Sequence, residues 1–198
     1  MKEDILEQLV DDYLQLRGFF TIHNVKFRPA PDDPKYVIKQ DAVHSDVDVV
    51  GFHPLRKGPD RIWVVSCKSW QGGFAPTAWI TAIEKNKRLG GREAWRYFRE
   101  LVNKKWADAL IGKIENLTGS TEFTYVTAVT KLLGNNPIPW QEYPPFRENL
   151  RGNRIKILTL KDILDDIYKR VSTPVASSEV GRLLQVIKAS GWLFPQSH

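Results

Sequence analysis

The 198-residue sequence predicts an α/β protein in which a mixed β-sheet carries helices on its faces. Two observations predict this class. Apolar residues recur with the 3.6-residue period of amphipathic helices near both ends of the chain and in its middle. Between these segments lie short runs rich in β-branched and aromatic residues, which are typical of strands. The predicted order is therefore helix, three strands, helix, strand, strand and helix.

The N-terminal elements begin with a helix over residues 3–17. Its apolar side chains recur at helical spacing, and Gly18 follows where a helix commonly stops. The run FFTIHNVKFRP, residues 19–29, is typical of a strand that ends at prolines. A turn-rich connection then leads to residue 44.

Two alternating runs come next, SDVDVVGF at residues 45–52 and RIWVVSCKSW at residues 61–70. The loop between them is of hairpin length or slightly more, so we expect an antiparallel pair. Side chains alternate between the faces of a strand, which places Asp46 and Asp48 on one face and Val47 and Val49 on the other. On the second strand Ser66 and Lys68 share a face, and Cys67 is expected in the core on the opposite side.

The C-terminal half starts with a helical pattern over residues 77–117, broken at Gly90 and Gly91. Its apolar stripe is expected to face the sheet and consists of Trp95, Phe98, Val102, Trp106 and Ala109. The runs EFTYVTAVTKLL and RIKILTL are two further predicted strands, separated by a proline-rich loop.

Thr159 and Asp162 resemble a capping box and predict the start of the last core helix. We therefore expect an α/β domain over residues 1–171. Residues 172–198, with a Ser/Pro/Ala lead-in and one amphipathic helix, are expected to form a C-terminal helical appendage that packs on this core.

Composition narrows the classes of protein that fit. A single cysteine excludes an internal disulfide framework, and the N-terminus lacks the apolar stretch of a secretory signal. No apolar run approaches the length of about 18 residues that spans a membrane. We expect a cytoplasmic protein. A formal net charge of +6 favours polyanions such as nucleic acid, although many basic proteins bind none.

The charges on the two central strands are the candidate site. One interpretation is a buried ion pair between Asp48 and Lys68 without functional consequence. A buried ion pair is, however, a poor source of stability, because desolvation can exceed the Coulomb gain. The alternative is metal-assisted phosphodiester hydrolysis. Asp48 and Asp46 would supply oxygen ligands to Mg²⁺, and Lys68 would orient a water or stabilise charged oxygens.

The order DVDVV, a loop and then VVSCKSW resembles the PD-(D/E)XK nuclease superfamily, which includes type II and Mrr-like restriction endonucleases and Holliday-junction resolvases. The resemblance implies a restriction-endonuclease-like αβββαβ core over residues 1–171 and DNA cleavage with Mg²⁺ or Mn²⁺. It implies catalytic roles for Asp48, Lys68 and an N-terminal glutamate, which matches Glu7. It also implies that the backbone carbonyl of Cys67 joins Asp48 and Asp46 as a metal ligand.

One position departs from the family pattern, because Ser66 stands where the triplet has Asp or Glu. Serine is a weak metal ligand, so another carboxylate would have to substitute. Asp46 is the nearest candidate and Glu84 the second. Three interpretations therefore remain open. The chain is an active deoxyribonuclease, or a silent nuclease-fold module that binds DNA or a partner protein in a defence or repair system, or a structural domain without such a function. A homodimer is also compatible with the sequence.

Several residues beyond Lys68 are candidates for nucleic-acid contacts. Five basic residues are expected to form a stripe beside the apolar one, as a solvated face or as a phosphate-contact surface: Lys85, Arg88, Arg92, Arg96 and Arg99. Trp70 and Phe74 are expected either to stack on a base or, as core residues, to pack the loop. Glu93 and Tyr97 resemble a Q-x-x-x-Y motif of some superfamily branches, with Glu in place of Gln.

Overall fold

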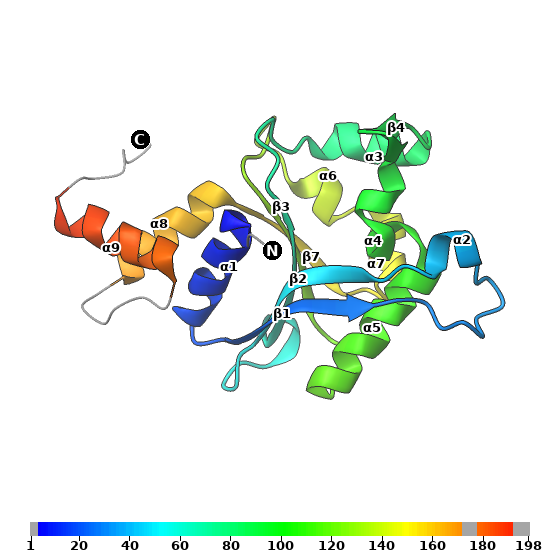
Figure 1. Cartoon of the computed structure of the whole chain (residues 1–198), viewed down its shortest axis with the longest axis horizontal. Helices are drawn as coiled ribbons and strands as arrows, with labels where there is room; N and C mark the ends of the chain where they lie inside the picture. Colours follow the sequence, from blue (N-terminus) through cyan, green and yellow to red (C-terminus); the bar gives the residue numbers. More distant parts are fainter. Residues whose placement is uncertain (1–3, 172–177, 192–198) are drawn as a thin grey trace.

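The structure is a computed structural model that describes residues 4–171 and 178–191. Its centre is an open five-stranded sheet in the order β1-β2-β3-β6-β7 (Figure 1). The first three strands are antiparallel, and β3, β6 and β7 are parallel. Their bounds are β1 Phe20–Phe27, β2 Ser45–Phe52, β3 Ile62–Lys68, β6 Thr124–Val129 and β7 Arg154–Thr159. The predicted class, an α/β protein with a mixed sheet and helices on its faces, is confirmed.

One face of the sheet is covered by α1 (Ile5–Gln15), α8 (Leu160–Arg170) and α9 (Glu179–Ala189), which lie together on the left in Figure 1. Asp4 caps α1 by accepting a hydrogen bond from the Leu6 backbone N–H at 2.8 Å. The expected capping box is present at the start of α8, where the Thr159 hydroxyl and the Asp162 carboxylate each bond the other's backbone N–H. A hydrophobic cluster between these helices and the sheet includes Val49 and Val65.

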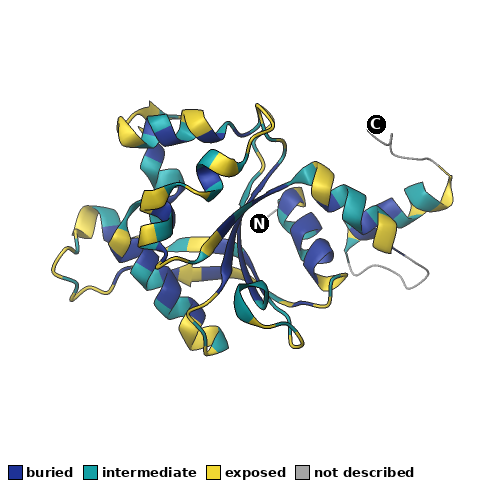
Figure 2. Ribbon diagram, turned by 180° about the vertical axis from the view of Figure 1, so that it is seen from behind, coloured by how far each residue is buried: buried dark blue, intermediate teal, exposed yellow. Residues whose placement is uncertain are grey.

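The opposite face is covered by α3 (Pro76–Glu84), α4 (Arg99–Val102), α5 (Lys104–Thr118), α6 (Ile138–Gln141) and α7 (Pro144–Asn149). Figure 2 shows the buried residues gathered on the sheet and on the helix faces turned towards it. This second cluster is rich in aromatic rings, with Phe74, Phe98 and Trp140 fully buried at its centre. The two clusters form a three-layered molecule, with helices on both sides of one sheet.

The helical pattern predicted over residues 77–117 is confirmed in its break at Gly90 and Gly91, but the segment is a series of shorter elements and is less helical than predicted. Gly90 and Gly91 both have positive φ, at 54° and 83°. They form the turn of a small hairpin, β4 (Arg88–Leu89) and β5 (Arg92–Glu93), which a 3₁₀ helix, η2 (Ala94–Tyr97), follows. The expected single stripe is therefore divided among η2, α4 and α5. Of its residues, Phe98 and Trp106 are buried in the aromatic-rich cluster.

The strand alternation around Asp48 also differs from the prediction. Val47 packs in the aromatic-rich cluster and Val49 in the cluster under α1, instead of sharing one face. The neighbouring strand is distorted at the same position. The β1–β2 register pairs His23 with Val49 and Val25 with Val47, and Asn24 between them has a positive φ of 51°. The change of side-chain face at Asp48 thus coincides with a local distortion of the edge strand.

Short elements in the loops were not predicted: α2 (Ile38–Asp41), the 3₁₀ helix η1 (Gly58–Asp60), and α6 and α7 in the proline-rich loop. The C-terminal helix packs on the core as expected, with Leu184 of α9 buried in the cluster under α1. The predicted lead-in at residues 172–177 and the end of the appendage at residues 192–198 lie outside the described residues. Within the described part of the chain, none of the helices is long and apolar enough to cross a membrane.

Candidate functional site

A polar cavity of about 420 Å³ lies where β2 begins and β3 ends. These two ends are adjacent because β2 and β3 are antiparallel. In sheets with parallel strands, ligands commonly bind outside the carboxyl ends of the strands, and β3 and β6 end here. The wall opposite the strands is formed by the segment from β5 to α4. The lining residues that carry the site are Asp46, Asp48, Ser66, Lys68, Arg92, Arg96, Arg99 and Glu100.

Asp48 is held at the point where the two strands separate. The β2–β3 ladder runs from Phe52 and Ile62 to Val49 and Val65. Beyond that pair, the Asp48 carboxylate accepts a hydrogen bond from the Cys67 backbone N–H at 2.5 Å, through Oδ2. Burial raises the pKa of Asp48, and the positive charge of Lys68 opposes that shift. Asp46 is exposed at the same cavity, and its charge adds to the rise.

Lys68 reaches into the cavity from β3. Its ammonium donates a hydrogen bond to the Ser66 hydroxyl at 2.8 Å and lies 5.5 Å from the centre of the Phe98 ring. Ser66 itself is buried, with 2% of its surface exposed. Cys67, between them, packs towards the cluster under α1, and burial raises the pKa of its thiol well above the ordinary value. The predicted arrangement of Asp48, Lys68 and Cys67 on the two strands is thus the observed one.

Glu7 of α1 is close enough to this site for the charges of its aspartates to shift the pKa of Glu7. The pKa of Glu7 is raised to about 7, first by burial and then by the charges of Asp48, Asp4 and Asp46, while His23 lowers it. Its carboxylate does not line the cavity with Lys68. Glu7 lines a second cavity of about 480 Å³ together with residues of β1 and α9. The structure therefore brings Glu7 near Asp4, Asp46 and Asp48. Glu7 lines the second cavity, however, and not the cavity that holds Lys68.

Glu100 of α4 is a site residue that sequence reasoning missed. It is 3% exposed, it lines the cavity, and its carboxylate accepts a hydrogen bond from the Tyr125 hydroxyl. Burial raises its pKa, and the charge of Lys68 is the largest opposing influence. The sequence offers no signal for Glu100, because a lone glutamate within an expected helix is ordinarily a surface residue.

Glu84, the second candidate for the missing acid, is not at the site. It ends α3, and its carboxylate accepts a hydrogen bond from the Tyr143 hydroxyl at 2.8 Å at an exposed position. Glu84 does not line the cavity that holds Lys68. The prediction that it substitutes for the acid replaced by Ser66 is not supported by this geometry.

The five basic residues divide into two groups, so they do not form one helical stripe. Arg92, Arg96 and Arg99 line the cavity, from β5, η2 and α4 respectively. Lys85 follows the end of α3, and Arg88 lies on β4, where its guanidinium bonds the Gly91 carbonyl at 2.6 Å. Neither Lys85 nor Arg88 lines the cavity. The hairpin turn separates the two groups.

The aromatic candidates also divide. Phe74 is fully buried, as the packing interpretation expected. Trp70 lines the cavity and stacks on Trp79, with ring centres 4.6 Å apart. Tyr97 lines the cavity as well, whereas Glu93 forms an ion pair with Arg96 at 2.7 Å. The two residues that resemble a Q-x-x-x-Y motif lie on β5 and η2, not on one helix.

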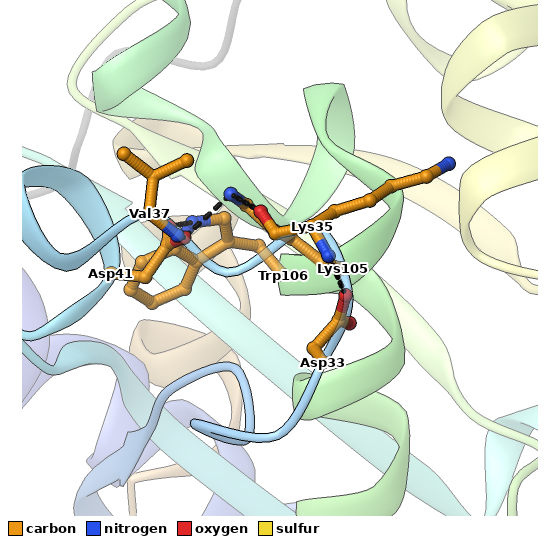
Figure 3. A network of polar contacts seen from close by, with 6 residues as sticks. All are labelled: Asp33, Lys35, Val37, Asp41, Lys105 and Trp106. Carbon is orange, nitrogen blue, oxygen red and sulfur yellow. Dashed lines mark hydrogen bonds and ion pairs between the residues drawn. The ribbon is translucent and has the colours of Figure 1, made fainter.

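The connection from β1 to β2, which brings Val43 and His44 to the cavity wall, is fixed by a buried ion pair (Figure 3). The Lys105 ammonium on α5 donates to Asp41 Oδ2 at 2.5 Å and to the Lys35 carbonyl at 2.9 Å. The Asp41 carboxylate also accepts from the Trp106 indole N–H at 3.1 Å and from the Val37 backbone N–H at 2.6 Å. Burial would raise the pKa of Asp41, but these hydrogen bonds outweigh it and lower the pKa.

Comparison of the chain with protein-family models, with curated proteins and with solved structures found no match. Among residues 4–171 and 178–191, no three His, Cys, Asp or Glu side chains are grouped so that they alone could hold a metal ion. Mg²⁺ commonly uses one or two carboxylates, with waters and substrate phosphates as its other ligands. Asp48 and the adjacent Asp46 match that smaller requirement.

Proposed function

We propose that the chain is a Mg²⁺- or Mn²⁺-dependent nuclease of the PD-(D/E)XK type that hydrolyses phosphodiester bonds in DNA. One observation carries the proposal. The Asp48 carboxylate and the Lys68 ammonium, on adjacent strands, meet in one cavity at the strand ends. The order of α1, three antiparallel strands, crossover helices and the parallel strand β6 supports a restriction-endonuclease-like αβββαβ core.

The residues that would hold the cation are Asp48, Asp46 and the backbone carbonyl of Cys67. Oδ2 of Asp48 is engaged by the Cys67 N–H, which fixes the carboxylate and leaves Oδ1 for a ligand. A bound divalent cation supplies Lewis acidity towards the phosphate and the attacking water. Most of the residues that line the cavity are polar, as a hard cation with water ligands requires.

Glu100 is the carboxylate beside Lys68 that stands in for the acid of the triplet, although Glu100, Asp46 and Asp48 are not grouped closely enough to hold a metal ion together. Ser66 occupies the position of the family's acid and is bonded to Lys68, so it offers the cation no charge. Glu100 enters the same cavity from α4, and the Tyr125 hydroxyl fixes its orientation. The chain thus keeps a second buried carboxylate near Lys68, delivered by a crossover helix instead of the strand.

Lys68 and Glu7 have separate roles in the proposed reaction. The ammonium of Lys68 is bonded to a neutral hydroxyl, so its charge is available to orient water or to stabilise the phosphate oxygens as negative charge develops. Glu7, with a pKa of about 7, exchanges a proton near neutral pH, which suits a group that assists proton movement. Its position on α1 near Asp46 and Asp48 matches that of the helix-borne glutamate of the superfamily.

A catalytically silent module that binds DNA or a partner protein is the second candidate. The observation that favours it is the contact between Lys68 and Ser66, because a serine in place of the acid removes one ligand from the strand. In this alternative the cavity still binds nucleic acid, but no bond is cut. The two candidates differ in one measurable property, cleavage in the presence of a divalent metal.

The test is nicking or cutting of supercoiled plasmid and branched DNA in Mg²⁺ and in Mn²⁺. We expect Asp48→Asn to lose metal binding and cleavage together. Lys68→Ala should keep metal and DNA binding while cleavage falls by about a hundredfold or more, the scale of losing one preorganised electrostatic donor. Asp165→Asn and Lys161→Ala on α8 are charge-matched controls, because these exposed residues pair with each other outside the cavity. A wild type that is inert in both metals, with Ser66→Glu inert as well, leaves the silent module.

A further inference from the structure

The three arginines of the cavity come from consecutive elements, and each guanidinium rests on an aromatic ring. Arg92 lies 3.8 Å from the centre of the Tyr97 ring, Arg96 lies 5.1 Å from Trp95, and Arg99 lies 4.9 Å from Trp106. Stacking occupies the faces of a guanidinium and leaves its N–H edge for hydrogen bonds. The arrangement therefore presents three donor edges at one wall of the cavity.

These guanidinium groups are crowded and incompletely neutralised. Burial lowers the pKa of Arg99, and the charges of Arg96 and Arg92 lower it further. Arg96 is paired with Glu93, and the charge of Glu100 offsets part of the pKa shift at Arg99. Nη1 of Arg99 is buried, and among the described residues it has no hydrogen-bond partner. A buried donor without a partner is costly, and an anion in the cavity would satisfy it.

The hairpin turn fixes the outermost of the three arginines. The Tyr97 hydroxyl donates to the Leu89 carbonyl at 2.9 Å, which ties the ring beneath Arg92 to strand β4. Gly90 has positive φ, and a Cβ there would lie 2.7 Å from the same hydroxyl. The turn thus packs directly against the ring that supports Arg92, and this guanidinium is preorganised at the cavity.

We propose that Arg92, Arg96 and Arg99 form a phosphate-binding subsite that holds a phosphate of a nucleic-acid strand beside the carboxylate cluster, without the help of a metal ion. This proposal deepens the proposed function and rests on it. Guanidinium groups bind phosphate oxygens through paired, charge-assisted hydrogen bonds, and three such edges suit the several oxygens of one phosphate group. A phosphate at the end of a strand and one within it share this chemistry, so the experiment separates the two sources.

The test uses binding of a short single-stranded DNA oligonucleotide in excess EDTA, with a 5′-phosphate or a 5′-hydroxyl. Arg92→Gln, Arg96→Gln and Arg99→Gln each remove one cavity guanidinium. Lys87→Gln and Lys85→Gln remove the same charge from the same region but outside the cavity, and they are the matched controls. Circular dichroism checks the fold, and Arg92→Gln and Arg96→Gln decide the result if Arg99→Gln does not fold.

We expect each cavity variant to bind about tenfold or more weakly, the scale of one charge-assisted hydrogen bond. The slope of log affinity against log salt should fall by about 0.7 per lost contact with a single strand. The two controls should change neither quantity. A preference for the 5′-phosphate that the cavity variants abolish identifies a strand end as the ligand, and equal binding of both oligonucleotides identifies an internal phosphate.

The proposal is overturned if the three cavity variants bind DNA like the wild type. It is also overturned if the control variants lose as much affinity as the cavity variants. Cleavage is measured separately in Mn²⁺, so the two proposals fail independently. Wild-type cleavage with unaltered binding by the cavity variants removes the subsite and keeps the nuclease. The expected binding pattern without any cleavage keeps the subsite and removes the nuclease.

Discussion

The ammonium of Lys68 donates a hydrogen bond to the hydroxyl of Ser66 at 2.8 Å, two residues earlier on the same strand. Both side chains therefore lie on one face of β3, at the cavity that Asp48 shares. Under the proposed assignment to the PD-(D/E)XK superfamily, this contact gives Lys68 a neutral partner where the family pattern has an acid. It is the feature that most directly separates an active metal-dependent enzyme from a silent binding module.

Restoring the acid should strengthen the metal site. Ser66→Glu adds a carboxylate beside Lys68, and we expect tighter Mn²⁺ binding and a lower Mn²⁺ requirement for cleavage. Because Ser66 is buried, the larger side chain should cost about 1–3 kcal/mol of unfolding free energy. Ser66→Gln, which has the same size without the charge, is the control. Equal Mn²⁺ affinity of the two variants, measured by calorimetry, would show that the position lies outside the metal site.

Glu100 should be essential for cleavage, whereas Glu84 should not. Glu100→Gln keeps the shape of the side chain but removes its charge, so we expect cleavage to fall by about a hundredfold or more while the fold persists. Glu84→Gln removes the same charge from outside the cavity and serves as its control. Cleavage rates in Mn²⁺ decide between them. Comparable rates for Glu100→Gln and the wild type would exclude Glu100 from the reaction.

The two central strands could be predicted from the sequence, because the β-branched and aromatic run over residues 61–70 has few other interpretations. For residues 77–117 the sequence predicted the break at Gly90 and Gly91 but not how short the elements after it are. Phe98 and Trp106 are spaced as on one helix, yet Phe98 has φ −143° and interrupts the chain between η2 and α4. Two glycines at positive φ turn the chain back before that point. Local periodicity does not record the interruption at Phe98.

Sequence analysis could predict only those residues of the candidate site that lie on the two strands. Lys68 follows the alternation of β3, and the antiparallel pairing of β2 with β3 brings Asp48 to the same cavity, although the alternation of β2 breaks at Asp48. The positions of Glu100 and Arg99 depend on how the crossover segment folds back over the strand ends, and neither spacing nor composition specifies that path. Glu84, equally acidic and nearer in sequence to Lys68, lies outside the cavity for the same reason.

Glu7 should make stability depend on pH. The fold raises its pKa from 4.5 to about 7, so the folded protein binds the proton more tightly than the unfolded chain. The stability that follows is present below pH 4.5 and is lost as the pH rises through 7. Allowing for partial solvent screening, the loss should be about 1–2 kcal/mol.

Glu7→Gln mimics the protonated form and should remove this loss. In excess EDTA, we expect the variant to be more stable than the wild type at pH 8 and equal to it near pH 4. Glu115→Gln, at an exposed position on α5, is the control. Urea unfolding at a series of pH values gives the difference. A difference between Glu7→Gln and the wild type that does not change with pH would contradict the prediction.

Asp41 should be the main anchor of the connection between β1 and β2. Asp41→Ala leaves the Lys105 ammonium buried without its carboxylate, which should cost about 3–5 kcal/mol of unfolding free energy. Asp33→Ala, which removes only a hydrogen bond to the Lys35 N–H, is the control and should cost about 1 kcal/mol or less. Denaturant unfolding measures both. Similar costs for the two variants would contradict the anchoring role.

The most direct test of the central claim is the position of Mn²⁺ in crystals of the protein soaked in that metal, located by its anomalous scattering. We predict a peak beside the Asp48 carboxylate, in the cavity that also holds Lys68 and Glu100. The peak should vanish in Asp48→Asn crystals and persist in Asp165→Asn crystals. A Mn²⁺ peak only in the second cavity beside Glu7, or none near Asp48, would contradict the account.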